Sequence, residues 1–231
     1  MKIKNIEVIW KSDLISNSMP DIKVNSEIEL RRSLIKKGWQ SHVNSISNSL
    51  HLVSEKQLDE LLKSIWDIYI NEKQFFICGN GGSACNSNHF AQDLTKGTIE
   101  NGLSRPRIKA ISLCNDIGFI TATSNDDSYN NIFKHQLVTY ANKGDGLFVL
   151  SGSGNSKNLI EAVEWADSNG METFGILGYD GGILKDRLSN YIHINLNHME
   201  KCEGIMSIIL HYIMCELKEL YNVTLGKYEG S

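Results

Sequence analysis

From residue 74 to residue 196 the sequence alternates short apolar segments with longer segments of helical periodicity. Five of the apolar segments are bounded by Gly, Asn or Asp, as is typical of strands buried on both faces. They are QFFIC (74–78), IKAISL (108–113), GLFVLS (146–151), ETFGILG (172–178) and YIHINL (191–196). The segment between the third and fourth repeats apolar residues at helical spacing, with Asn155 or Ser156 as a cap and Gly170 after its end. Strands that alternate with helices predict a doubly wound α/β domain with a five-stranded parallel sheet.

Helical patterns also flank the predicted sheet. Residues 31–52 and 55–69 are predicted to form two helices before it, and residues 203–221 a long amphipathic helix after it. Residues 1–29 are Asn/Ser-rich and weakly periodic. We therefore predict an N-terminal extension over residues 1–29, which packs on a subunit or recruits a partner, and a single domain over residues 30–231.

Composition excludes several classes of protein. The 23 basic and 27 acidic side chains leave a net charge of −4, so no basic excess exists to bind nucleic acid. The most apolar run, residues 205–214, is half the roughly 20 residues that a membrane span needs, and the N-terminus has no signal-peptide pattern. Five cysteines without a CxxC pair argue against disulfides and a thiolate zinc site. We expect a cytoplasmic protein that binds neither nucleic acid nor a membrane.

Two loops after predicted strands have the composition of anion-binding turns. Residues 79–84 (GNGGSA) follow the first strand and residues 151–156 (SGSGNS) follow the third, and both lead into helices. Glycines let the backbone approach an anion, and a helix N-terminus supplies free N–H donors. Two such loops without a basic patch indicate a small phosphorylated metabolite, although each could also be a plain connection. The first loop also fits the glycine pattern of a dinucleotide-binding fingerprint. That fingerprint expects an acidic residue about 20 residues further on, and Asp116 comes too late. An NAD-dependent enzyme is therefore disfavoured.

Acid–base candidates lie on the predicted helices. His89 and Asp93 are spaced i, i+4 and therefore share one helix face after the first loop. Glu203 and His211 are about 12 Å apart along a helix axis and could meet one metal ion only from opposite sides of it. Hydrogen-bonded structural histidines are the alternative for His89 and His211, and His198 with Glu200 are possible substitutes.

Four motifs together resemble one known family. CGNGGSACNSNHFAQDL, TSNDD (123–127), LSGSGNSKNLIEA (150–162) and LGYDGG (177–182) resemble the sugar isomerase (SIS) family, and within it the phosphoheptose isomerase branch. The resemblance implies an aldose–ketose isomerase that converts sedoheptulose 7-phosphate to D-glycero-D-manno-heptose 7-phosphate through an enediol. It also implies a homotetramer whose active sites form between subunits.

The resemblance assigns roles to individual residues. Asp93 and His211 take the catalytic positions, and a Zn²⁺ ion, one per site, takes its ligands from the set His89, Asp93, Glu203 and His211. The predicted substrate-binding residues are Asn80, Gly81, Gly82, Ser83, Asn125, Asp126, Ser151, Gly152, Ser153, Ser156 and Glu203. Two positions depart from the family, because Asp93 replaces its usual Glu and Glu203 its usual Gln.

These departures leave two alternatives to the heptose substrate. One is an isomerase of a different phosphosugar. The other is a non-catalytic SIS protein that binds a sugar phosphate or a protein partner, as one relative binds the bacterial replication initiator. Retention of His89, His211 and a carboxylate at position 93 favours an enzyme.

Overall fold

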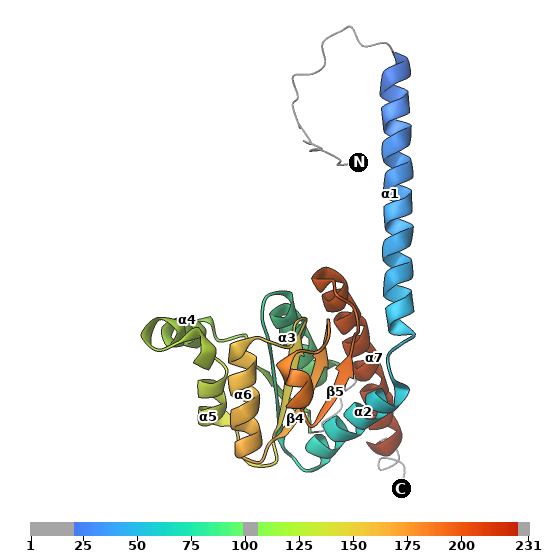
Figure 1. Cartoon of the computed structure of the whole chain (residues 1–231). Helices are drawn as coiled ribbons and strands as arrows, with labels where there is room; N and C mark the ends of the chain where they lie inside the picture. The colour runs from blue at the N-terminus through green and yellow to red at the C-terminus, as the bar shows by residue number, and fades with distance from the viewer. Residues whose placement is uncertain (1–20, 99–105, 226–231) are drawn as a thin grey trace. The chain divides into compact units, whose positions relative to one another are not determined.

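The structure is a computed structural model that describes residues 21–98 and 106–225 (Figure 1). Residues 1–20 of the predicted extension lie outside the described residues. The chain divides into two units, residues 1–45 and residues 46–231. Within the described ranges, no helix is both long enough and apolar enough to cross a membrane.

Helix α1 spans Asp21–Leu50 and begins ten residues before the predicted start at residue 31. Residues 21–50 contain no proline and only one glycine, Gly38, so nothing in this stretch interrupts a helix. Leu34, Ile35 and Trp39 on α1 are exposed, between 59% and 71% of their surface. The domain boundary at residue 30 therefore falls inside a continuous helix, and the role of the extension stays a prediction.

The five predicted strands form one parallel sheet with the order β2-β1-β3-β4-β5. Their bounds are Gln74–Gly79 (β1), Lys109–Ser112 (β2), Gly146–Ser151 (β3), Glu172–Leu177 (β4) and Asn190–His193 (β5). The chain runs from β1 outward to β2 and then returns to place β3 on the other side of β1. The switch point of this doubly wound sheet therefore lies between β1 and β3, where ligands bind at the carboxyl ends of such strands.

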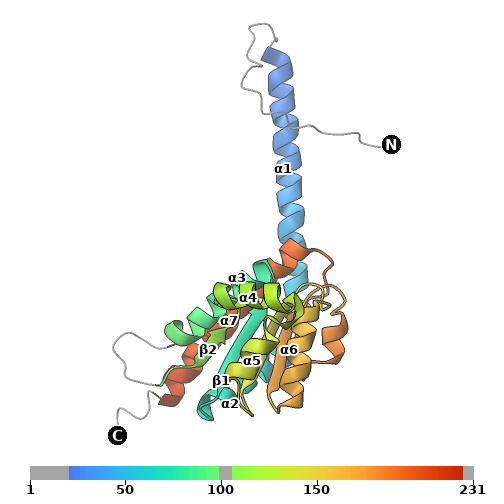
Figure 2. The same ribbon diagram turned by 90° about the vertical axis from the view of Figure 1, so that its left-hand side faces the viewer.

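Helices cover both faces of the sheet (Figures 1 and 2). One face packs against α2 (Glu55–Ile70), α3 (Gly82–Gln92) and α7 (Met199–Leu225), and the other against α5 (Lys134–Tyr140) and α6 (Lys157–Ser168). The remaining elements are α4 (Ile117–Asp126), the π-helical turn η1 (Asp93–Gly97) and the 3-10 turns η2 (Tyr129–Asn131) and η3 (Ile183–Asp186).

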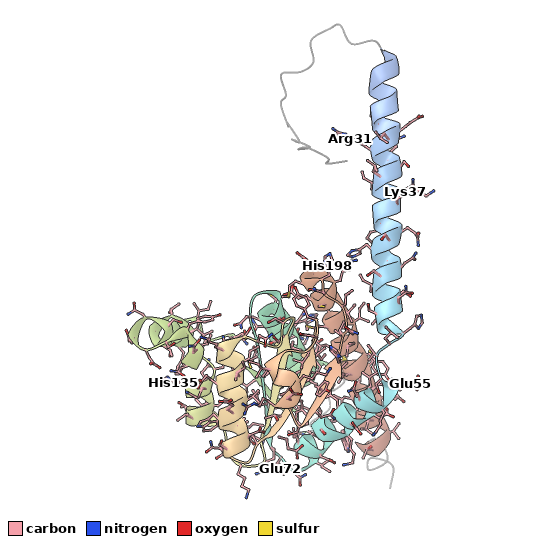
Figure 3. All side chains as sticks on the ribbon, in the orientation of Figure 1. Arg31, Lys37, Glu55, Glu72, His135 and His198 are labelled. Atoms are coloured by element: carbon pink, nitrogen blue, oxygen red, sulfur yellow. The ribbon has the colours of Figure 1, made fainter. Side chains whose placement is uncertain are left out.

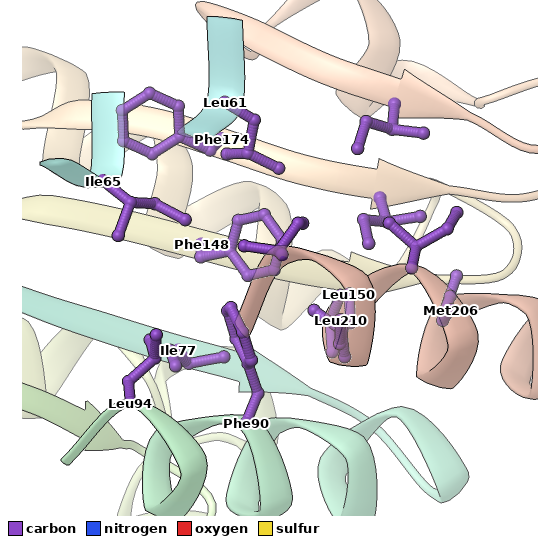
Figure 4. Packing of buried hydrophobic residues seen from close by; sticks show 14 of the residues in the cluster. Leu61, Ile65, Ile77, Phe90, Leu94, Phe148, Leu150, Phe174, Met206 and Leu210 are labelled. Carbon is purple, nitrogen blue, oxygen red and sulfur yellow. The ribbon is translucent and has the colours of Figure 1, made fainter. Parts of the chain in front are cut away.

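Strand β3 shows why the sheet is buried on both sides. Phe148 and Leu150 point into the cluster under α2, α3 and α7, and Leu147 and Val149 into the cluster under α5 and α6. Alternate strand residues face opposite sides of a sheet, so an unbroken apolar strand requires two covered faces. Figure 4 shows the first cluster, where Phe148 lies among side chains of α2, α3 and α7. The rigid sheet between two apolar layers holds the loops after β1 and β3 beside each other.

Candidate active site

The loops after β1 and β3 enclose a cavity of about 290 Å³ at the switch point of the sheet. Eight predicted substrate-binding residues line it together with three apolar side chains, Leu150, Leu159 and Met199. The eight are Asn80, Gly81, Ser83, Ser151, Gly152, Ser153, Ser156 and Glu203. Within the part of the chain that the structure describes, no lysine or arginine lines this cavity. An anion here would be held by hydroxyl groups and backbone N–H groups.

The serine loop, residues 151–156, presents hydroxyl groups whose protons are free to be donated. The Ser151 Oγ accepts from the Gly154 N–H at 2.9 Å, and the Ser153 Oγ accepts from the Asn155 N–H at 3.2 Å. Ser156 is the N-cap residue of α6, and its side chain makes no capping hydrogen bond. The first N–H groups of a helix have no partner within the helix and carry a partial positive charge. The loop can therefore surround a phosphate with donors although it has no cation.

The turn after β4 packs directly on the serine loop. Gly154 has a φ of +66°, and a Cβ atom at this position would overlap the carbonyl oxygen of Gly181. The Leu184 N–H donates to the Gly154 carbonyl oxygen at 3.0 Å. Only a glycine allows both this backbone conformation and this approach. The LGYDGG motif therefore supports the shape of the serine loop.

Asn80 connects the glycine loop, residues 79–84, to α6. Its side chain exchanges two hydrogen bonds with Asn158, of 2.9 and 2.8 Å, and its Oδ1 also accepts from the Tyr129 hydroxyl at 3.0 Å. Asn158 is buried although it lies in the first turn of α6. Sequence reasoning missed Asn158 and Tyr129. The sequence did carry a signal for Asn158, because it is a polar residue on the buried face of the helix that follows the serine loop.

Glu203 reaches the glycine loop from the first turns of α7. A Cβ atom added to Gly82 would overlap the Glu203 carboxylate, so that carboxylate lies against the start of α3. The Asn86 side chain donates to the Glu203 carbonyl oxygen at 3.0 Å and ties α3 to α7. Among the described residues, no hydrogen bond or ion pair engages the Glu203 carboxylate, which lines the cavity.

His89, Asp93 and His211 come together further along the same two helices. The Asp93 Oδ2 lies 3.5 Å from the His89 Nε2 and 3.7 Å from the His211 Nε2. The two imidazole rings are 4.9 Å apart between centroids and nearly perpendicular. The Asp93 side chain is only 13% exposed, whereas those of His89 and His211 are about half exposed, 50% and 52%. Asp93 opens the π-helical turn η1, and such turns often occur at functional sites.

This trio fits a divalent metal such as zinc. One ligand atom from each residue can be chosen so that all three lie within 4.8 Å of one another. Two imidazoles and a carboxylate are a usual set for a catalytic zinc ion, which keeps its fourth position open. Glu203, the fourth predicted ligand, is not in this group and lies about 12 Å along α7 from His211. Its predicted role as a metal ligand stays a prediction.

Other predicted residues do not line the cavity. Asn125 and Asp126 are exposed at the end of α4, where the Asn125 side chain donates to the Asp126 carboxylate at 2.7 Å. His198, one of the possible substitutes, lies just before α7 (Figure 3) and its Nδ1 is 3.0 Å from the Glu200 carboxylate. Both side chains of that pair are exposed.

Three thiols near the two loops, those of Cys78, Cys114 and Cys202, are not poised as nucleophiles. Burial raises the pKa of Cys78 well above its usual value, and burial also raises the pKa of Cys114. The Cys114 Sγ donates to the Gly79 carbonyl oxygen at 3.4 Å. Burial likewise raises the pKa of Cys202, which precedes Glu203 on α7. These three thiols stay protonated at neutral pH, so they support the loops and do not attack a substrate.

A parallel sheet with a cavity at its switch point is typical of ligand-binding α/β proteins of the doubly wound class. Comparison with known proteins identifies the family. The SIS domain family matches residues 38–178. The chain is 35% identical to a phosphoheptose isomerase of Helicobacter pylori strain P12, over 80% of this chain and 94% of the relative. It is also 35% identical to the phosphoheptose isomerase of Glaesserella parasuis serovar 5, over 76% of this chain and 88% of the relative.

Solved structures share the fold. A phosphoheptose isomerase from Francisella tularensis aligns with a TM-score of 0.74 at 23% identity, over 82% of this chain and 98% of that one. Phosphoheptose isomerase GmhA from Neisseria gonorrhoeae aligns with a TM-score of 0.73 at 22% identity, over 81% of this chain and 98% of that one. The chain belongs to the SIS domain family. Within that family it belongs with the phosphoheptose isomerases.

Proposed function

We propose that this protein is an aldose–ketose isomerase that converts sedoheptulose 7-phosphate to D-glycero-D-manno-heptose 7-phosphate. One observation carries the proposal: an anion cavity and a His–Asp–His trio lie along the same pair of helices, α3 and α7. A seven-carbon phosphate ester in extended form spans about 10 Å, at ~1.5 Å per C–C bond. That length is comparable to the roughly 12 Å rise along α7 between Glu203 and His211.

The serine loop holds the phosphate end in this proposal. Ser151, Ser153 and Ser156 donate hydroxyl protons, and the start of α6 adds backbone N–H donors. Asn80 is held by Asn158 and contacts the carbon chain. The phosphate is thereby fixed at one end while the carbonyl end extends over the glycine loop.

Asp93 and His211 carry the proton transfers. The Asp93 carboxylate removes a proton from C1 of the open-chain ketose, a C1–C2 double bond forms, and the C2 carbonyl oxygen takes a proton from His211. Asp93 then returns its proton to C2, while the C1 hydroxyl group gives its proton to His211 and becomes the aldehyde. Each group ends in its starting state, so the reaction needs no external oxidant or reductant.

A metal ion would assist at the oxygen atoms. His89, Asp93 and His211 would hold it, and a bound zinc ion supplies Lewis acidity that polarises the sugar oxygens. If Asp93 is a metal ligand, its other oxygen remains to serve as the base. A nitrogen of His211 that exchanges protons with the sugar cannot hold a metal ion at the same time, so His211 would bind the metal only through its other ring nitrogen.

We also propose that the active enzyme is a cytoplasmic homotetramer that binds neither nucleic acid nor a membrane. The half-exposed His89 and His211 support a site that a neighbouring subunit completes. Exposed Asn125 and Asp126 would then reach substrate in an adjacent subunit, which accounts for their absence from this chain's own cavity.

The direct test is turnover. We expect purified protein to form an aldose from sedoheptulose 7-phosphate, faster with added Zn²⁺ than with a chelator. Fructose 6-phosphate and ribulose 5-phosphate serve as shorter substrates and should react more slowly. A folded tetramer inactive on the heptulose in both conditions would refute the heptose assignment, and faster reaction of a shorter ketose would assign a different phosphosugar.

A further inference from the structure

Strand β2 forms one edge of the sheet, and no strand pairs with its outer side in the part of the chain that the structure describes. The Leu113 N–H, directly after β2, donates inward to the Ile77 carbonyl oxygen at 2.9 Å. Backbone groups point inward and outward at alternate residues of a strand, so Ala110 and Ser112 present their N–H and C=O groups outward. Such an edge is a template to which another extended segment can add.

A groove of about 530 Å³ follows this edge and takes its walls from both faces of the sheet. The wall on the α3 side contains two amide side chains, Asn88 and Gln92, around Ala91. The opposite wall contains Ile111 of β2 and Tyr140 of α5, which are 39% and 50% exposed. The groove therefore combines a row of main-chain partners with one mostly polar wall and one apolar wall.

We propose that residues 5–10 of this chain, NIEVIW, add to β2 as a further strand and fill this groove. The segment lies outside the described residues, and its sequence has the pattern of a half-buried strand. Ile6, Val8 and Trp10 fall on one side of such a strand, and Asn5 and Glu7 on the other. Residues with β-branched and aromatic side chains also favour strands.

The two sides of the segment match the two walls of the groove. The side with three apolar residues fits the wall of Ile111 and Tyr140, and the side with Asn5 and Glu7 fits the amide groups of the α3 wall. Ile9 is the one apolar residue on the polar side, where the α3 wall offers Ala91. A shift of one residue would reverse both matches, so the pattern also selects the register.

Charge and chain length favour the same pairing. Among the described residues that line the groove, Asp116 is the only charged one, whereas residues 2–11 contain three lysines and one glutamate. Opposite charges therefore attract the segment to this edge. Residues 11–20 separate the segment from α1 and can extend to about 35 Å, so the segment can bind away from the start of α1, on its own copy or on a neighbouring one.

The first test is hydrogen exchange of the full chain, read by peptide mass spectrometry. A variant with Val8→Pro and Ile9→Pro loses two successive N–H groups, one of which must face β2 in any register. We expect the amides of Ala110 and Ser112 to exchange at least about tenfold faster in this variant than in the wild-type protein.

A variant with Ser16→Pro and Asn17→Pro is the matched control. It carries the same two prolines between the segment and α1, and its exchange at residues 110–112 should equal that of the wild-type protein. Unchanged exchange in the Val8 and Ile9 variant, or an equal increase in the control, would overturn the proposal, because the segment would then not protect this edge.

The second test is a lysine-reactive cross-linker applied to a mixture of ordinary and isotope-labelled wild-type chains. We expect Lys109, the first residue of β2, to be joined to Lys4 if the segment runs parallel to β2 and to Lys11 if it runs antiparallel. Links within one chain and links between two copies both support the pairing, and the labels tell them apart. The absence of any link between Lys109 and residues 2–11 would overturn it.

Discussion

Replacement of His211 by alanine separates chemistry from binding. In the proposed mechanism His211 exchanges protons with the two sugar oxygens, and its Nε2 lies 3.7 Å from the Asp93 Oδ2. It does not line the cavity in which we propose that the phosphate binds. We therefore expect His211→Ala to lose turnover and to keep its affinity for the phosphate end of the substrate.

The structure sets the size of each effect. A positioned general acid–base group contributes about 10²–10⁴ in rate, so kcat should fall by at least about a hundredfold. The His211 side chain is 52% exposed, and its loss should change the free energy of unfolding by no more than ~0.5 kcal/mol. Since His211 lies about 12 Å along α7 from Glu203, the Kd for inorganic phosphate should stay within about threefold.

Three measurements on one preparation check this: turnover of sedoheptulose 7-phosphate, calorimetric titration with inorganic phosphate, and urea unfolding. His135→Ala is the control, because His135 is also a partly exposed histidine paired with a carboxylate, Asp127, at 3.5 Å, but on α5. That variant should match the wild-type protein in all three assays.

Two results would refute the reasoning. If His211→Ala retains turnover, the acid lies elsewhere, and His198 beside Glu200 becomes the next candidate. If phosphate binding falls in step with turnover, His211 shapes the cavity, and the separation of the two parts of the site is wrong.

Three further predictions concern the metal, the loop and the thiols. Asp93→Asn should weaken zinc binding by at least about tenfold in competition with a chelator, and unchanged affinity would exclude the trio as the metal site. Gly154→Ala should lower the free energy of unfolding by about 1–3 kcal/mol in urea, because of its φ of +66° and the overlap with the neighbouring turn. Gly204→Ala, within α7 and open to solvent, should be neutral or stabilising by up to ~1 kcal/mol, and equal losses would disprove the loop argument. At pH 7 exposed Cys85 should be alkylated at least about tenfold faster than buried Cys78, whose raised pKa lowers its thiolate fraction, as peptide mass spectrometry can show.

Local patterns predicted most of the fold. The five apolar segments became the five strands within two or three residues of their expected ends, because strand length and burial on both faces follow from the residues themselves. Ser156 is the N-cap residue of α6, although its side chain makes no capping hydrogen bond, and Gly170 follows the end of the helix with a φ of +72°. The predicted start of α1 is ten residues too late. Asn and Ser disfavour a helix only weakly, and this stretch has no proline and a single glycine to interrupt it.

The candidate site was predicted in composition and only partly in arrangement. The sequence predicted the serine loop, the glycine loop and the pair His89 and Asp93, because the residues of each group lie close together in the chain. It did not find Asn158, which acts through Asn80, 78 residues earlier. The carboxylate of Glu203 lies at Gly82, and its role as a metal ligand stays a prediction.

The sequence by itself therefore determined the parallel α/β class, two loops with the composition of anion-binding turns, and the residue types proposed for proton transfer. Only the tertiary structure decided that β1 and β3 are neighbours, that His211 meets Asp93, and that Glu203 lies at the glycine loop. The reason is physical. Periodicity and capping act over a few residues, whereas the order of strands and the packing of α3 against α7 come from burying the apolar faces of the whole domain at once.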